Sequence, residues 1–483
     1  MTRVAALKVS NTAIEGLLVV ELDVRSDNRG WFKENWQRAK MTELGVPDFG
    51  PVQNNMSFNT TAGATRGFHA EPWDKFVSLA RGRIFGAWVD LRPGPGFGTA
   101  VTLEMGVQTA VFVPRGVGNA FQTLEDETAY SYLVNDHWSQ AAKDSYTFVN
   151  LADETLGISW PIPLEQAELS EADKAHPRLD AVMPMPARQT LVVGANGQLG
   201  RSLVQALPAA VAVGREALDL TDAVSVAAFD FTPYGVIINA AAFTEVDAAE
   251  TEAGRRQAWA TNVSGVGALV EAARAHRCTL VHVSSDYVFD GVKEVHSEGE
   301  PFSPLGVYGQ TKAAADALVA SLTRHYILRT SWVVGEGHNF VRTMAGLADR
   351  GVRPAVVEDQ YGRLTFTTEL ARAVLHLLDI SAPYGTYNVT NAGQVMTWAD
   401  IAREVYAARG ADPAEVSGTT AAAYAAGKSL APRPRHSMLS LKKISATGFQ
   451  PADALEALRQ YLSAVPELRP SPPPAGSSGR RAH

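Results

Sequence analysis

Short apolar runs separated by glycine- and proline-rich turns dominate the chain before residue 188. We predict strands at the runs 16–20, 76–79, 84–89 and 111–113. Turn signals such as Arg81-Gly82 and Pro93–Gly96 stand between them. Closely spaced short strands with such turns are typical of antiparallel barrels and sandwiches. The first part of the chain is therefore predicted to be all-β.

After residue 188 the pattern changes to strands that alternate with helices. The runs 191–193, 236–238 and 280–283 are almost wholly apolar. Parallel strands that are covered on both faces have this character, because neither face meets water. The alternation of strand, glycine-rich turn and helix predicts a doubly wound Rossmann sheet.

Length and composition support this division. A chain of 483 residues is expected to form two or three domains, and 46% hydrophobic with 19% charged residues is typical of globular proteins. Prolines cluster before residue 188, which indicates a linker. We predict a β-rich domain at 1–180, a linker at 181–188, a Rossmann domain at 189–465 and a disordered tail at 466–483.

Charge and cysteine content narrow the function classes. A net charge of −8 disfavours a nucleic-acid partner or an anionic membrane surface. Cys278 is the only cysteine of the sequence, so we expect neither a disulfide framework nor a cysteine-based zinc site. No apolar run approaches the ~20 residues that span a bilayer. We therefore expect a cytoplasmic protein.

A glycine-rich turn follows the first strand of the second part. Glycines allow the tight turn and the close approach of a pyrophosphate, and the following helix N-terminus favours its negative charge. The spacing indicates a dinucleotide site, although such a turn can also be purely structural. The candidate residues are Gly194, Asn196, Gly197, Gln198, Leu199 and Gly200.

The second strand does not end on the acidic residue that would bind the ribose 2′-hydroxyl of NAD. Arg215 stands there and could face a 2′-phosphate, or it could be a solvated loop residue. This slightly favours NADPH, and NADH stays open. Asp219 and Leu220 follow as candidate cofactor contacts.

Tyr308 and Lys312 stand four residues apart, so on a helix they share one face. A lysine ammonium near a phenol is expected to lower its pKa, which suits proton donation to a carbonyl that receives hydride. Ser285 closes a buried strand and could hydrogen-bond the same carbonyl oxygen.

Residues 189–465 resemble dTDP-4-dehydrorhamnose reductase, of the extended short-chain dehydrogenase/reductase superfamily. The matching strings are 194–200, 236–247, 281–291, 308–312 and 329–333. The resemblance implies Tyr308 as the acid and Lys312 as its partner and ribose ligand. Ser285 takes a position where the family usually has threonine. Further implied contacts are Ala240 and Ala241 to the cofactor, Asp286 to the substrate, and Trp332, which could equally be a core aromatic.

In the first part, His69 stands out within Arg66–Glu71. A lone histidine on a barrel is more often structural, and metal-binding barrels need several histidines and a carboxylate that converge. Because Glu71 and Asn119 stand where such ligands would be, we predict no metal site.

Residues 10–180 resemble dTDP-4-dehydrorhamnose 3,5-epimerase, a metal-free cupin-type barrel. The matching strings are 27–34, 53–55, 66–69, 89–92, 97–98, 113–116, 156–161 and 169–173. The resemblance implies His69 as base, Asp173 as its orienting carboxylate, Tyr132 as acid and Lys75 as the group that stabilises the enolate. The implied nucleotide-sugar contacts are Arg29, Phe32, Glu34, Gln53, Asn55, Arg66, Asn119 and Trp138.

Two departures from the epimerase pattern stand out. Asn119 replaces the usual histidine, and the loop after His69 is shorter than usual. These departures affect substrate fit or the number of carbons epimerised.

Together these features predict a cupin-like jelly-roll barrel followed by a Rossmann domain with a small substrate-binding subdomain. The hypothesis is a bifunctional homodimer that epimerises dTDP-4-dehydro-6-deoxy-glucose and then reduces its C4 ketone with NADPH or NADH. Three alternatives stay open: a non-catalytic barrel, a regulatory Rossmann domain, and a product such as dTDP-6-deoxy-L-talose.

Overall fold

The computed structural model describes residues 7–138 and 141–464, and the predicted tail at 466–483 lies outside this part of the chain. The described chain forms two compact units that divide between Ala187 and Arg188. No helix among the described residues is long and apolar enough to cross a membrane.

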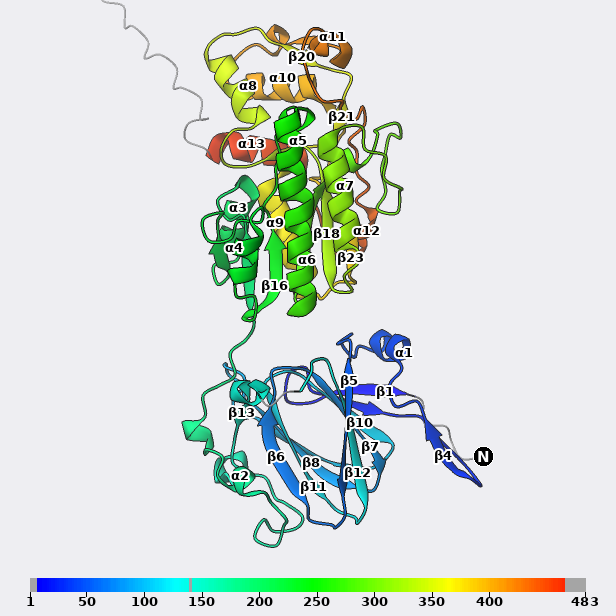
Figure 1. Ribbon diagram of the computed structural model, residues 1–483. Coiled ribbons are helices and arrows are strands. Elements are labelled where there is room, and N and C mark those ends of the chain that lie inside the picture. The colour runs from blue at the N-terminus through cyan, green and yellow to red at the C-terminus, as the bar shows by residue number, and fades with distance from the viewer. Residues whose placement is uncertain (1–6, 139–140, 465–483) are drawn as a thin grey trace, which may run out of the picture. The chain divides into compact units, whose positions relative to one another are not determined.

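The first unit is built from two antiparallel sheets, which confirms the all-β prediction (Figure 1). The six-stranded sheet has the order β1 (Lys8–Asn11), β2 (Leu18–Glu21), β10 (Thr109–Val113), β7 (Lys75–Arg81), β12 (Thr128–Val134), β5 (Gln53–Asn59). The five-stranded sheet has the order β13 (Thr147–Phe148), β6 (Thr65–Ala70), β11 (Val117–Thr123), β8 (Ile84–Asp90), β9 (Ala100–Met105).

Apolar side chains from both sheets pack together in a cluster between them. Val77 of β7 and Tyr130 of β12 pack with Trp88 of β8 and Phe121 of β11. Phe121 and Tyr130 stack with ring centroids 4.2 Å apart. Strands β6, β7, β11 and β12 also contribute polar side chains that line a cavity.

Three further segments complete this unit. A separate hairpin joins β3 (Val24–Asp27) to β4 (Gly30–Lys33), and the short helices are α1 (Arg38–Glu43) and α2 (Glu171–Lys174). The predicted linker begins within this unit, because Val182 and Met185 are buried in an apolar cluster with Phe68 of β6.

The second unit has a six-stranded parallel sheet, as the alternating pattern predicts. Its order is β15 (Val211–Val213), β14 (Gln189–Val193), β16 (Tyr234–Asn239), β17 (Thr279–Ser285), β18 (His325–Thr330), β23 (Gly385–Asn388). The strand order reverses beside β14, between β15 and β16. Open parallel sheets bind ligands at the carboxyl ends of strands at such a switch point.

Helices cover both faces of this sheet (Figure 1). One face packs on α6 (Gly265–Ala275) and α7 (Val307–Val319), and the other packs on α3 (Gln198–Ala206) and α9 (Thr367–Asp379). Leu280 and Val281 alternate between these two cores, since successive strand residues point to opposite faces. The remaining helices of this layer are α4 (Ala223–Ala228) and α5 (Glu252–Trp259).

A small lobe follows the sheet and has its own apolar core. Its helices are α8 (Phe340–Asp349), α10 (Trp398–Ala408), α11 (Ala421–Ala425) and α13 (Ala454–Ala464), whereas α12 (Lys442–Ala446) packs on the large sheet through Ile444. Its short strands are β19 (Val333–Val334), β20 (Ala355–Val357), β21 (Tyr361–Gly362), β22 (Thr365–Phe366), β24 (Met396–Thr397) and β25 (Ser417–Thr419). Thr397 and Asp400 form a capping box that starts α10.

Two candidate active sites

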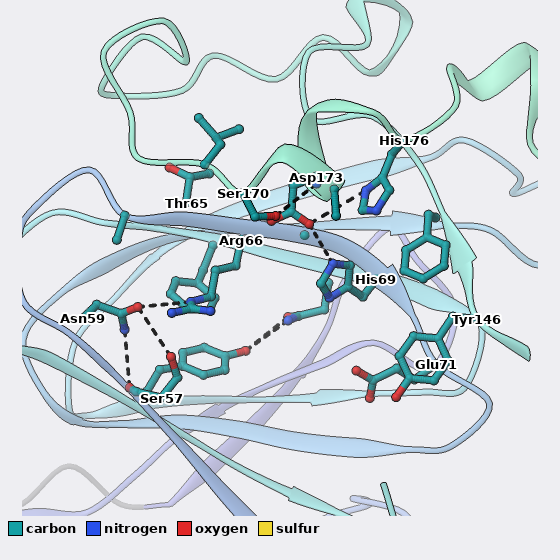
Figure 2. Close-up of a pocket in the computed structure, with 18 of the residues that line it drawn as sticks. Ser57, Asn59, Thr65, Arg66, His69, Glu71, Tyr146, Ser170, Asp173 and His176 are labelled. Carbon is teal, nitrogen blue, oxygen red and sulfur yellow. Dashed lines mark hydrogen bonds and ion pairs between the residues drawn. The ribbon is translucent and has the colours of Figure 1, made fainter. Parts of the chain in front are cut away.

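The barrel contains a cavity of about 1160 Å³. Figure 2 shows ten of its lining residues labelled, among them His69 and Asp173. The cavity brings together the predicted residues His69, Lys75, Tyr132, Arg66, Asn119, Trp138 and Asp173.

His69 and Asp173 form a hydrogen-bonded dyad across 104 residues of sequence. His69 lies on β6, and Asp173 lies on α2, where Ser170 caps the helix by accepting from the Asp173 amide. The His69 Nε2 to Asp173 Oδ1 distance is 2.9 Å (Figure 2). An imidazole that donates its Nε2 proton to a carboxylate keeps its lone pair on Nδ1.

Hydrogen bonds stabilise the negative charge of the Asp173 carboxylate. Burial raises the pKa of this carboxyl, but hydrogen bonds from His69 and Ser170 outweigh burial, so the pKa lies below its ordinary value. Asp173 is therefore ionised at neutral pH and fixes the orientation and tautomer of His69. The His69 ring stays 36% exposed and faces the cavity.

Lys75 and Tyr132 line the same cavity from the facing sheet. The Lys75 Nζ lies 5.7 Å from the centre of the Tyr132 ring and 2.8 Å from a carboxylate oxygen of Glu71. This ion pair is buried, so each charge depends on the other for compensation. Burial raises the pKa of the Tyr132 phenol, which therefore keeps its proton at neutral pH.

Asn119 has a structural partner that explains its place in the cavity wall. It faces His69 in the β11–β6 register. Its amide donates to the Tyr130 hydroxyl at 3.1 Å, and this pair is buried. The amide thus stabilises a phenol inside the apolar core, where an unpaired hydroxyl would be costly.

Five predicted nucleotide contacts do not line this cavity in a single chain. Arg29 pairs with Asp27 on the hairpin, Phe32 is 66% exposed, and Glu34 pairs with Lys40 beyond the hairpin. On β5, the Gln53 amide donates to Asn55 at 2.7 Å.

Three cavity residues were missed by sequence reasoning about function: Glu71, Tyr146 and His176. Glu71 was weighed only as a metal ligand. The Tyr146 hydroxyl is buried without a hydrogen-bond partner, and it lies beside Glu71 in Figure 2. His176 follows Asp173 by three residues, a spacing that places both on one side of a helical turn and that could have drawn attention to it.

The glycine-rich turn of the second unit lies at the switch point of its sheet. Gly194 has a φ of +78°, and a Cβ there would lie 2.6 Å from the Ala241 backbone nitrogen. A Cβ on Gly200 would lie 2.2 Å from the Gly194 oxygen. Both positions therefore require glycine, and Gly197 begins α3 without a side-chain cap, which leaves its first amides available to a phosphate.

Arg215 follows β15 and is accessible to solvent. Arg215 is exposed, whereas Leu220 is buried and packs against Gly265. Asp219 accepts hydrogen bonds from the Thr221 amide and hydroxyl and so stabilises the loop.

Tyr308 and Lys312 lie on α7 as predicted. Lys312 is buried with Ser285, and Tyr308 is partly buried. Burial raises the pKa of Tyr308 to about 12, although a hydrogen bond with Ser285 opposes this shift. Burial lowers the pKa of Lys312 to about 8, and its ammonium donates to the Val283 carbonyl at 2.7 Å. Burial dominates the pKa of Tyr308 in this arrangement, and the lowering by Lys312 stays a prediction.

Hydrogen bonds that the sequence did not reveal link the cofactor turn to His282, which lies beside Lys312. The Asn239 side chain accepts from the Ala241 amide and donates to His282 Nδ1 at 3.2 Å. A neutral His282 then carries its proton on Nε2, which lies 3.5 Å from the Lys312 Nζ.

Asp286 and Trp332 complete the predicted set. Burial raises the pKa of Asp286 to about 6, and its carboxylate accepts from the Ser285 hydroxyl at 3.0 Å. The partly buried Trp332 stacks on Trp398 with ring centroids 3.9 Å apart.

Comparison with known families identifies both units. The family profile described as RmlD substrate binding domain matches residues 188–466, and the profile described as dTDP-4-dehydrorhamnose 3,5-epimerase matches residues 11–181. The chain belongs to both families. It joins an epimerase domain to a reductase domain of dTDP-rhamnose biosynthesis.

Individual relatives match each domain over most of their own length. The RmlC homolog of Streptococcus pyogenes serotype M6 is 51% identical over 177 residues, which cover 36% of this chain and 89% of that protein. The dTDP-4-dehydrorhamnose reductase of Aggregatibacter actinomycetemcomitans is 39% identical over 295 residues, which cover 56% of this chain and 98% of that protein.

A solved structure supports the fold of the reductase domain. The dTDP-4-dehydrorhamnose reductase of Bacillus anthracis strain Ames, solved in complex with NADP, is 30% identical with a TM-score of 0.52. The match covers 57% of this chain and 98% of that structure. The epimerase and reductase predictions are thus confirmed at the level of the two families.

Proposed function

We propose that the epimerase domain inverts C3 and C5 of dTDP-4-dehydro-6-deoxy-glucose and that the reductase domain then reduces the C4 ketone to give dTDP-L-rhamnose. The observation that carries this proposal is the His69–Asp173 dyad in a cavity shared with Lys75 and Tyr132. A barrel that served only as a binding module would not need this arrangement. Conversion of that 4-keto sugar with NADPH, followed by NMR of the product, tests the proposal.

The epimerisation uses the acidity that the ketone confers on its neighbouring carbons. His69, held by Asp173, removes the C5 and C3 protons through Nδ1. Lys75 stabilises the enolate oxygen, and its ion pair with Glu71 holds the side chain in place. Tyr132, which keeps its proton at neutral pH, returns a proton to the opposite face.

The glycine-rich turn at 194–200 and the N-terminus of α3, which has no side-chain cap, fit the pyrophosphate of a dinucleotide. In the reduction a bound nicotinamide cofactor supplies hydride to C4. Tyr308 donates the proton to the C4 oxygen, Ser285 hydrogen-bonds that oxygen, and Lys312 holds the cofactor ribose. Gly194, Gly197 and Gly200 admit the pyrophosphate, with Asn196, Gln198, Leu199, Ala240 and Ala241 around it.

The order of the two reactions follows from their chemistry. Reduction removes the ketone that acidifies C3 and C5, so epimerisation must come first. Fusion of both domains in one chain raises the local concentration of the intermediate near the second site.

We propose NADPH as the preferred cofactor, because Arg215 is exposed where the 2′-phosphate would lie. Arg215→Ala is expected to raise the KM for NADPH about tenfold, the loss of one charge-assisted hydrogen bond. The KM for NADH is expected to stay unchanged. Steady-state kinetics with both cofactors measures this, and Arg256→Ala, on the exposed face of α5, is the matched control. Equal effects on both cofactors would contradict the assignment.

We propose that the protein is a homodimer in which the β3–β4 hairpin of one chain completes the cavity of its partner. The hairpin carries Arg29 and the exposed Phe32, whereas neither residue lines the cavity of its own chain. Strand exchange between barrels of this family would bring these side chains, and Glu34 after them, to the diphosphate and the base.

A mixing experiment tests this arrangement. Arg29→Ala and His69→Ala are each expected to abolish proton exchange at the sugar, for different reasons. When the two variants are co-expressed with different tags, half of the dimers are mixed and each has one intact site. Exchange is then expected to recover to about one quarter of wild type, given twofold symmetry. If Arg29 acts within its own chain, the mixed dimers stay inactive.

A further inference from the structure

Three side chains at one end of the cavity converge in the arrangement of a metal site. The ligand atoms of His69, Asp173 and His176 all lie within 4.8 Å of one another. The His69 Nε2 lies 2.9 Å and the His176 Nδ1 lies 4.0 Å from the same carboxylate oxygen, Asp173 Oδ1 (Figure 2). Ligand atoms around a tetrahedral zinc ion, at about 2.0–2.2 Å from it, lie about 3.3–3.6 Å from one another, which falls between these two separations.

His176 is the member of this cluster that the dyad does not explain. Its Nδ1 is buried and has no hydrogen-bond partner. Its ring is held by stacking on Phe148 with centroids 4.6 Å apart, and it meets the His69 ring edge-on at 5.6 Å. The ring is therefore fixed with an unused lone-pair position directed toward Asp173.

We propose that these three residues bind one divalent transition ion of the zinc type and that this ion switches epimerisation off. Two imidazoles and one carboxylate are a ligand set that Zn²⁺ accepts, with a fourth position left open. All three residues line the cavity. Only small movements of the His176 and Asp173 side chains are needed to close the site.

The effect on catalysis follows from the tautomer of His69. An ion bound at Nε2 takes that lone pair, so the proton of the neutral ring moves to Nδ1. Nδ1 can then no longer accept a proton from the sugar. The carboxylate of Asp173 would bind the ion and would no longer accept the hydrogen bond from His69. This inhibition rests on the proposed role of His69 as base, whereas the binding of the ion does not.

Binding is tested on the full-length protein without substrate. The protein is titrated with ZnCl₂ in competition with a chromophoric chelator, and the same is done for His176→Gln. We expect one tight site in the wild type and an affinity at least about tenfold weaker in the variant. His137→Gln, an exposed histidine outside the cluster, should bind as wild type does. Equal binding by wild type and His176→Gln overturns the site.

Inhibition is tested by deuterium exchange of the 4-keto sugar with and without one equivalent of Zn²⁺. We expect the wild type to lose exchange and to regain it with EDTA, while His176→Gln keeps most of its own zinc-free rate. NADPH oxidation with sugar that has already been epimerised should not respond to the ion. Tight binding without loss of exchange would uphold the metal site and overturn the switch, whereas a wild type that shows no exchange even without Zn²⁺ would overturn the proposed epimerisation instead.

Discussion

Replacing Tyr308 by phenylalanine is expected to lower the rate of NADPH oxidation by about 10³-fold, the range typical of a lost general acid. The substrate for this assay is sugar that has already been epimerised, so that only the reductase domain is measured. The Tyr308 side chain is partly buried and its phenol is hydrogen-bonded to Ser285, and phenylalanine keeps the edge-to-face contact with Tyr287 at 5.5 Å. Deuterium exchange by the epimerase domain is expected to stay at the wild-type rate.

The matched control for this change is Tyr234→Phe, a buried tyrosine at the start of β16 and thus at the other end of the sheet. Its variant should reduce the sugar as wild type does. Activity of Tyr308→Phe within about tenfold of wild type would contradict the role of the phenol as proton donor.

Replacing Asp173 by asparagine is expected to lower deuterium uptake at C3 and C5 by about 10³-fold or more, as in other dyads and triads that depend on a carboxylate. The amide removes the negative charge that stabilises the protonated ring. It can also donate to His69 Nε2 and so select the tautomer that lacks a lone pair on Nδ1. Uptake is followed by NMR of the 4-keto sugar in D₂O without a nicotinamide cofactor.

Glu171→Gln is the matched control, because Glu171 lies on the same helix and its side chain is 89% exposed. It should exchange protons at the wild-type rate. Reduction of epimerised sugar should be unchanged in both variants. If Asp173→Asn retained most of the exchange, the dyad would not be the source of the base.

Residues whose roles depend on local sequence were predictable. The glycines of the 194–200 turn and the Tyr308–Lys312 pair act within one turn or one helix, where spacing alone sets geometry. The pattern of apolar runs also predicted the antiparallel strands of the first unit and the parallel sheet of the second. The pairing of His69 with Asp173 spans 104 residues, and only the family resemblance indicated it.

Features that depend on tertiary burial were not predictable. Glu71 compensates the charge of Lys75, which is buried beside it. The His282 ring lies 3.5 Å from the Lys312 ammonium, a contact that the sequence pattern does not indicate. The pKa of Tyr308 rises because its surroundings exclude water, which a helical spacing does not reveal. Arg29 illustrates another limit, because in its own chain it pairs with Asp27 and does not line the cavity, so its predicted role depends on the proposed dimer.

The most direct test of the two-step account is conversion of dTDP-4-dehydro-6-deoxy-glucose with NADPH in D₂O, with NMR of the product. The account predicts dTDP-L-rhamnose that carries deuterium at both C3 and C5. An L-talo product with the same two deuterium atoms would keep both steps and change only the face of reduction. A reduced D-sugar that retains protons at C3 and C5 would contradict the account, because reduction would then have occurred without epimerisation.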